Sequence, residues 1–355
     1  MRRVARRPAA ALVAAVLTAA MTACGSSGDA PAGSDSSAAA PSDKKITVYS
    51  GRSENLVKPL LEAFSKQTGI AVETRYAGTS AMATQLLEEG DKSPADVFFA
   101  QDAGALGAVA KAGLFVAQPS DVTGKVPEVY RAKSGEWVGV TARARVLVHN
   151  PETTPPADLP KSVFELTDAK WKGKVGVAPT NASFQAFVTA VTVQHGEAKA
   201  QEFLKGLAAN EPQIRDGNAK IMEEVESGKI AVGLINHYYL GELAKEQGKA
   251  PDALKSRLHF FPGGDSGALV NIAGVGVLKR AAQDADVRTF VDYLLGAEGQ
   301  KYFVEKTFEY PVVAGVAAPA FVPALDSLNV PKVDLNDIDD LASTVKLIKD
   351  SGLVP

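Results

Sequence analysis

Two adjacent tyrosines, Tyr238 and Tyr239, are the residues of this sequence that best suit a chemical role. They closely follow residues 230–235, an apolar run that predicts a buried strand. A phenolate is a hard oxygen donor that prefers a hard, highly charged cation, and such a cation displaces the phenol proton at neutral pH. The pair therefore indicates a site for a trivalent metal ion. The structural alternative is that the two rings pack against opposite faces of a sheet edge.

Four predicted strands end in short polar segments, each just before a predicted helix. They are Ser50-Gly-Arg-Ser53, Ala77-Gly-Thr-Ser80, Gln101-Asp-Ala-Gly104 and Pro179-Thr-Asn-Ala-Ser183. Small hydroxyl and amide residues cap helices, and capping explains any single junction. Helix N-termini also bind anions. With four such segments around one cleft, an anion-binding role and a role in capping alone are about equally favoured.

Three arginines are candidates for contact with an anion. Arg143 and Arg145 alternate on one face of the strand-like stretch Trp137–His149, and Arg52 stands in the loop after the first predicted strand. A guanidinium suits a carboxylate or a phosphate because it can donate two parallel hydrogen bonds. For Arg143 and Arg145 the favoured interpretation is a solvated strand face. Arg52 is the better anion-binding candidate, while Arg143 is kept as a possible cleft residue.

The periodicity predicts an α/β protein. Residues 46–111 hold three strand–helix units, which favour a parallel sheet, and residues 174–235 begin a second α/β pattern. We expect one helix over residues 287–307 and another over residues 335–349. Because ligands of open α/β sheets bind outside the carboxyl ends of the strands, two such domains facing each other would form a binding cleft.

The N-terminal segment predicts export. Residues 1–23 combine four arginines with a short apolar run, as a signal peptide does. Cys24, the only cysteine, follows small residues in a pattern that is similar to a bacterial lipobox, although Met21 stands where leucine is usual. The alternative is a plain cleavable signal. Residues 24–43 carry no large apolar side chain and predict a flexible tether, lipidated at Cys24.

The composition excludes several classes of protein. The chain has 38 Lys+Arg against 41 Asp+Glu, a net charge of −3, which disfavours a nucleic-acid partner. One cysteine and four histidines exclude a cysteine-rich zinc module. Neither a phosphate-binding glycine loop nor a G-x-S-x-G nucleophile motif is present. We therefore expect a protein that is not an enzyme, with an exported hydrolase kept as an alternative.

Segments spread over about residues 44–350 resemble the ferric-ion-binding proteins of bacterial ABC importers, a branch of the periplasmic solute-binding proteins. They are Ile46-Thr-Val-Tyr-Ser-Gly51, Ser93-Pro-Ala-Asp-Val-Phe-Phe99, Thr141-Ala-Arg-Ala-Arg-Val-Leu-Val148, Gly233-Leu-Ile-Asn-His-Tyr-Tyr239, Ser256-Arg-Leu-His-Phe260 and Gly267-Ala-Leu-Val270. The resemblance implies that Tyr238 and Tyr239 bind Fe(III) between two lobes, with a synergistic anion such as carbonate, phosphate or citrate.

The resemblance also implies where the other ligands should lie. The anion would bind at the residues that match the family's helix start and asparagines, which are Thr180, Asn181, Ala182, Ser183, Asn218 and Asn236. One subgroup of the family adds a histidine and a glutamate from the first lobe, but those positions are Ser53 and Gln101 here. Two phenolates leave up to four positions of an octahedron for anions, water or a chelator, so both bare Fe(III) and a small chelate fit the sequence.

The function implied is an extracytoplasmic receptor that captures Fe(III) and delivers it to the permease of an ABC importer. The alternative is a metal-free receptor for a small organic anion or a phosphonate-like solute on the same fold. Each lobe would be a mainly parallel sheet flanked by helices, with the ligand cleft between residues 44–140 plus 265–315 and residues 141–264 plus 316–355. We expect a monomer held by its lipid anchor on the outer face of the cytoplasmic membrane.

Overall fold

The computed structural model describes residues 44–354. The predicted signal peptide, the tether and the lipidation site at Cys24 lie outside these residues. Of the helices that are described, none combines the length and the apolar character needed to cross a membrane.

The described chain opens with the three strand–helix units that the periodicity predicts. Their bounds are β1 (Lys45–Ser50), α1 (Glu54–Thr68), β2 (Ala71–Tyr76), α2 (Thr79–Glu89), β3 (Val97–Ala100) and α3 (Ala103–Lys111), followed by the short β4 (Phe115–Val116) and α4 (Ser120–Thr123). The helix α1 buries Val57, Leu60, Leu61 and Phe64 on one face and ends at Gly69. The φ of 73° at Gly69 is left-handed, which glycine adopts without steric penalty.

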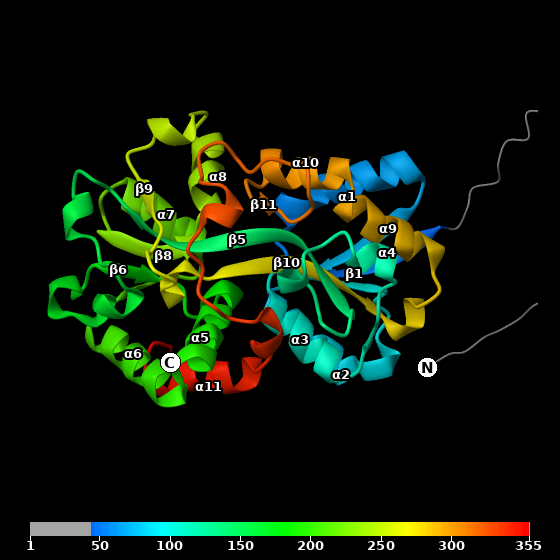
Figure 1. The fold of residues 1–355 in the computed structure, drawn as a ribbon, viewed down its shortest axis with the longest axis horizontal. Helices are drawn as coiled ribbons and strands as arrows, with labels where there is room; N and C mark the ends of the chain where they lie inside the picture. The colour runs from blue at the N-terminus through cyan, green and yellow to red at the C-terminus, as the bar shows by residue number, and fades with distance from the viewer. Residues whose placement is uncertain (1–43, 355) are drawn as a thin grey trace, which may run out of the picture. The chain divides into compact units, whose positions relative to one another are not determined.

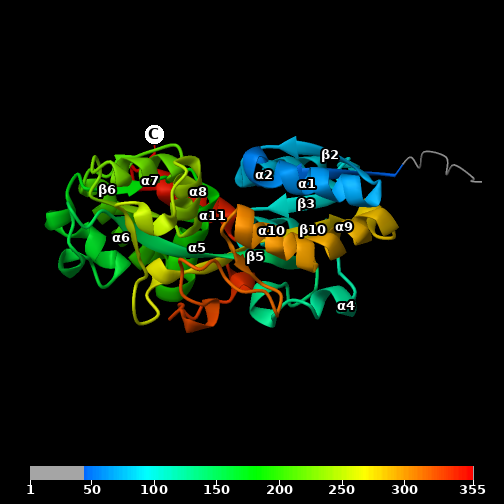
Figure 2. The same cartoon turned by 90° about the horizontal axis from the view of Figure 1, so that it is seen from above.

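Two long strands, β5 (Trp137–His149) and β10 (Val270–Leu278), run through the middle of the sheet (Figure 1). The strand order is β2-β1-β3-β10-β5-β8-β6-β7. Residues 137–144 of β5 pair antiparallel with β10, and residues 145–149 pair antiparallel with β8. The strand β5 therefore belongs to both halves of the sheet and connects them (Figure 2).

The second half of the sheet begins at β6. Its elements are β6 (Val175–Val177), α5 (Ala182–His195), α6 (Glu197–Ala209), β7 (Gln213–Ile214), α7 (Asn218–Glu226), β8 (Val232–Asn236), α8 (Tyr238–Glu246) and β9 (Arg257–His259). The strand β6 runs parallel to β7 and β8. Helices α7 and α8 lie on one side of these strands, and α5 and α6 lie on the other (Figure 1).

The C-terminal segment differs from the prediction in two places. The helix expected over residues 287–307 is two helices, α9 (Ala285–Leu295) and α10 (Ala297–Lys306), because Gly296 is extended with φ −80° and ψ 170°. The helix expected over residues 335–349 starts later, as α11 (Leu341–Asp350), after a 3₁₀ turn at Leu335–Asp337. Asp340 caps α11 by accepting a hydrogen bond from the N–H of Ser343. The short β11 (Tyr310–Pro311) pairs with β5.

An apolar cluster supports the start of α8. It packs Ile221, Met222 and Val225 of α7 against Ile235 of β8 and Leu240 and Leu243 of α8. Each of these side chains is buried, so the turn from β8 into α8 rests on close-packed apolar contacts. This packing fixes the direction in which the residues at the beginning of α8 project.

Candidate functional site

The tyrosine pair lies at the junction between β8 and α8. Asn236 ends the strand, His237 has helical backbone angles, and Tyr238 is the first residue of the helix. The rings of Tyr238 and Tyr239 stack on each other, with their centroids 4.3 Å apart and their planes at 30°. The alternative that they pack on opposite faces of a sheet edge is therefore wrong. Tyr238 is buried, whereas Tyr239 lines a cavity.

His237 holds this junction in place. Its Nδ1 accepts a hydrogen bond from the N–H of Ala144 at 3.1 Å, so its Nε2–H donates to the carbonyl of Phe308 at 3.0 Å. Burial lowers the pKa of His237 to about 3, which keeps the ring neutral. With both ring nitrogens engaged, His237 has a structural role, and it ties α8 to the segment after α10.

That segment is held in an unusual conformation. Phe308 has a φ of 59°, in the left-handed region that side chains with a Cβ rarely adopt. Its ring packs against Gly241 of α8, where a Cβ would come within 2.5 Å of the ring. The close approach is possible because residue 241 is glycine, and the next residue in this segment is Glu309.

Glu309 is buried between two arginines. An Oε2 of its carboxylate lies 2.7 Å from Nη2 of Arg52 and accepts a further hydrogen bond from Thr307, while Oε1 lies 3.7 Å from Nε of Arg143. All three charged side chains are at most 1% exposed. Burial acts to lower the pKa of Arg52, but the charge of Glu309 together with smaller contributions from Tyr238, Tyr239 and Glu242 outweighs it, and the pKa is raised. For Arg143, burial and the charge of Arg52 lower the pKa.

The interpretation of Arg143 and Arg145 as a solvated strand face is wrong. Both are buried because β5 is an inner strand, with β10 and β8 as neighbours. Arg143 donates to the carbonyl of Ile272, but its Nε and Nη1 have no hydrogen-bond partner. Arg145 donates to the carbonyl of Leu234 and stacks over the ring of Phe187, and burial lowers its pKa to about 9. Arg143 is thus a buried cation with spare donors on the side of Tyr238, whose phenolate it would stabilise.

The residues predicted to bind the anion are partly brought together. Oδ1 of Asn181 accepts hydrogen bonds from the N–H and the hydroxyl of Ser183, and Nδ2 of Asn218 donates to the same hydroxyl at 3.1 Å. Asn236 is buried at the end of β8, opposite Arg145 of β5. Ala182 begins α5, and Thr180 is exposed. Buried Oδ1 of Asn218 has no hydrogen-bond partner.

Ser53 and Gln101, the two positions where one subgroup of the family has a histidine and a glutamate, contribute no ionisable metal ligand. Ser53 is exposed at the start of α1, where its side chain makes no capping hydrogen bond. Gln101 is half-buried, and its backbone N–H donates to Oγ1 of Thr79. Among residues 44–354, no group of three or more His, Cys, Asp or Glu side chains is placed to hold a metal ion.

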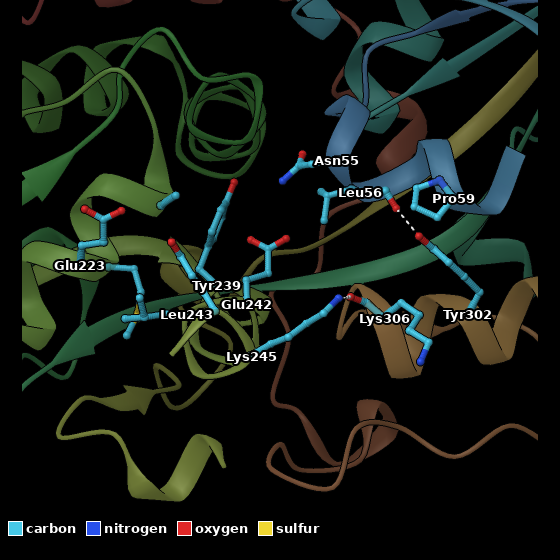
Figure 3. Close-up of a pocket in the computed structure, with 13 residues that line it drawn as sticks. Asn55, Leu56, Pro59, Glu223, Tyr239, Glu242, Leu243, Lys245, Tyr302 and Lys306 are labelled. Carbon is cyan, nitrogen blue, oxygen red and sulfur yellow. Dashed lines mark hydrogen bonds between the residues drawn. The ribbon is translucent and has the colours of Figure 1, made fainter. Parts of the chain in front are cut away.

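Tyr239 lines a cavity of about 640 Å³ between α1, α7, α8 and α10. Asn55, Leu56 and Pro59 line it from α1, and Tyr239 and Glu242 project into it from α8 (Figure 3). Sequence reasoning missed Glu242. Burial and the charge of Glu309 raise the pKa of Glu242 to about 8. Glu242 follows Tyr239 by three residues and Tyr238 by four, and this helical spacing could have identified it from the sequence.

Comparison with known proteins identifies the family. Residues 92–339 match the model of a family described as bacterial extracellular solute-binding protein. The chain belongs to this family. The resemblance seen in the sequence is confirmed, and so is the α/β fold. Family members are transport receptors rather than enzymes; they work outside the cytoplasm with an ABC transporter as partner and a small solute as ligand.

Relatives of this solute-binding protein include iron-binding proteins. It is 36% identical to an Fe(3+)-binding periplasmic protein of Serratia marcescens, over 89% of this chain and 93% of that one. It is 33% identical to the major ferric iron-binding protein of Neisseria meningitidis serogroup B, over 89% and 95%.

Solved structures agree with these relatives. Iron-bound HitA from Pseudomonas aeruginosa superposes with a TM-score of 0.82 at 35% identity, covering 87% of this chain and 99% of that one. The Trichodesmium protein IdiA (FutA), in complex with iron and citrate ligands, has a TM-score of 0.72 at 30% identity, with coverage of 87% and 99%.

Proposed function

We propose that this solute-binding protein captures Fe(III) outside the cytoplasmic membrane and delivers it to an ABC importer. The observation that carries the proposal is the stacked pair Tyr238 and Tyr239 at the edge of the cavity, next to two buried arginines. Its relatives named as ferric-iron-binding proteins support the choice of metal.

The tyrosines would supply the metal ligands as phenolates. Burial raises the pKa of Tyr238 well above its ordinary value, whereas the charges of Arg143 and Arg52 act to lower it. Without metal the phenol keeps its proton. A trivalent ion that binds the oxygen replaces the proton, and the arginines then offset the negative charge of the phenolate in a site with little water.

A synergistic anion would complete the shell of oxygen ligands. We propose that carbonate, phosphate or citrate binds at the start of α5, next to Asn181, Ser183 and Asn218 and near Asn236. The N-terminus of α5 favours negative charge, and the hydrogen bonds among these side chains fix their positions. Ser53 and Gln101 leave room on the α1 side for a chelate that brings its own oxygen ligands, so the iron is captured either bare with an anion or as a small chelate.

Capture would involve closure of two lobes. We propose lobes made of residues 44–140 plus 265–315 and of residues 141–264 plus 316–355. The chain would cross between the lobes within β5, at residues 140–141, before β10, at residues 264–265, and after β11, at residues 315–316, and these crossings would carry the bending. Lipid on Cys24 would keep the protein, as a monomer, on the outer face of the cytoplasmic membrane near its permease.

An absorption titration of the purified protein with ferric citrate tests this function. The expected result is a phenolate-to-iron charge-transfer band that saturates near one equivalent and is absent in Tyr238→Phe. Repeating the titration with chelator-free iron plus carbonate or phosphate separates the ion from the chelate. If no band forms under any of these conditions, the tyrosines do not bind iron, and thermal stabilisation by organic anions alone would then indicate a metal-free receptor.

A further inference from the structure

The helix that carries the tyrosine pair also carries a carboxylate one turn further on. Glu242 is three residues after Tyr239 and four after Tyr238, so the three side chains share one face of α8. Glu242 and Tyr239 line the same cavity and project toward α1 (Figure 3). A hard carboxylate oxygen thus projects from the same rigid element as the two phenol oxygens.

Glu242 has no protein partner in the described chain. Within residues 44–354 its carboxylate forms no ion pair and accepts no hydrogen bond, although it is partly buried. Two other buried glutamates are neutralised: Glu309 pairs with Arg52, and Glu224 pairs with Arg215 and Lys229. Removing a carboxylate from water without a counter-charge is unfavourable, so this position favours a protein that binds a cation there.

The nearby cations Arg52 and Lys245 act on Glu242 through their charge, but neither forms an ion pair with it in the described chain. Arg52 already forms an ion pair with Glu309 at 2.7 Å, and it is not among the residues that line the cavity. Lys245 also lines the cavity, but its ammonium group donates to the carbonyl of Lys306 and is otherwise exposed. The remaining acidic residue on this helix, Glu246, is exposed to solvent. Glu242 is therefore the carboxylate of α8 that is both desolvated and free to bind a ligand.

We propose that Glu242 is a third protein ligand of the Fe(III) held by Tyr238 and Tyr239. This inference rests on the proposed function. Two phenolates and one carboxylate carry three negative charges, which balance a trivalent ion, and all three are hard oxygen donors. Glu242 thereby supplies the anionic ligand that Ser53 and Gln101 do not provide from the other side of the cleft. Three positions of an octahedron remain for the anion or chelate.

Three variants test this assignment by the charge-transfer band and by competition with citrate. Glu242→Gln removes the charge and is expected to weaken iron binding by about 100-fold or more. Its band should move to longer wavelength, because an iron with one anionic ligand fewer accepts an electron more readily. Glu242→Asp keeps the charge but shortens the side chain, so a direct ligand predicts a defect similar to that of Glu242→Gln. Glu246→Gln, on the same helix and cavity, is the matched control and should bind as the parent protein does.

Each result has a definite meaning. If Glu242→Gln keeps the parent affinity and band while Tyr238→Phe loses both, Glu242 is not a ligand and the proposed function stands. If Glu242→Asp retains the parent affinity and band while Glu242→Gln does not, Glu242 acts through its charge at a distance and ligation is excluded. If the parent protein itself forms no band with iron, the proposed function fails whatever the Glu242 variants do. Thermal unfolding of metal-free Glu242→Gln should occur at or above the parent temperature, because the variant removes a desolvated acid.

Discussion

The guanidinium of Arg52 lies 2.7 Å from the carboxylate of Glu309, although 257 residues separate them in the sequence. Both side chains are at most 1% exposed. The pair joins the loop after β1 to the segment that follows α10. Arg143 lies 3.7 Å from the same carboxylate. One buried carboxylate therefore faces two buried guanidinium groups, and the three side chains together carry a net positive charge. That excess charge favours a phenolate at Tyr238.

Removing the carboxylate should destabilise the whole fold. We expect Glu309→Gln to lower the free energy of unfolding by about 3–5 kcal/mol, because it leaves two buried guanidinium groups without a counter-charge. Glu202→Gln is the control, since it breaks the exposed pair between Glu202 and Lys199 and should change stability by less than about 1 kcal/mol. Urea unfolding measures both. Equal losses of unfolding free energy in the two variants would show that the buried ion pair contributes no more to stability than the exposed one.

The close contact between Gly241 and Phe308 predicts a packing defect in Gly241→Ala. The new methyl would lie 2.5 Å from the Phe308 ring, and overpacking of this kind costs about 1–3 kcal/mol. Alanine regains up to about 1 kcal/mol in helix propensity, so a net loss of about 1–2 kcal/mol is expected. Gly78→Ala, where no atom lies within 4 Å, is the control. Thermal unfolding of metal-free protein measures both, and a Gly241→Ala variant more stable than the parent would contradict the argument.

Asp102 predicts a stability that depends on pH. Burial raises its pKa from 3.8 to about 6, so its neutral form is favoured in the folded state. The contribution of this group is fully present below pH 3.8 and is lost as the pH rises through about 6. Asp102→Asn keeps an oxygen that can accept from the N–H of Ala105. It should stabilise the protein by up to about 3 kcal/mol above pH 7 and by much less at pH 4.

Urea unfolding of Asp102→Asn and the parent protein at pH 4 and pH 7.5 checks this. Asp216→Asn is the control, because Asp216 is exposed in the loop just before α7. The effect of this substitution on the free energy of unfolding should differ little between the two pH values. A stabilisation by Asp102→Asn that is the same at both pH values would rule out the ionisation of Asp102 as its cause.

Local patterns in the sequence predict most of the elements. The strand β5 runs over Trp137–His149 as predicted, because its apolar pattern is continuous and a proline follows shortly after its end. The break between α9 and α10 was missed because Gly296 stands inside a continuous helical pattern, where glycine is often tolerated.

The surroundings of the site depend on pairings between distant segments. The sequence of β5 shows alternation at Arg143 and Arg145 but does not show that β10 and β8 flank the strand, and this is why their burial was not predicted. The partnership of Arg52 with Glu309 is equally non-local. Glu242, by contrast, could have been found, since its spacing from Tyr238 is a local feature of one helix. The roles of the candidate ligands remain predictions that the variants above will test.

A hydrogen bond across the two halves of the molecule predicts a way to shift their closure. The hydroxyl of Ser80 in α2 donates to Oε1 of Gln185 in α5 at 2.7 Å. If lobe closure accompanies capture, Gln185→Ala should favour the open form of the protein and weaken iron binding by up to about 10-fold, since the loss of one hydrogen bond is worth about 1 kcal/mol. The radius of gyration in small-angle X-ray scattering should rise in the metal-free variant and return to the parent value with saturating ferric citrate. Thr84→Ala, one turn along α2 and exposed, is the control. A Gln185→Ala variant with unchanged affinity and unchanged radius would show that this contact does not hold the lobes together.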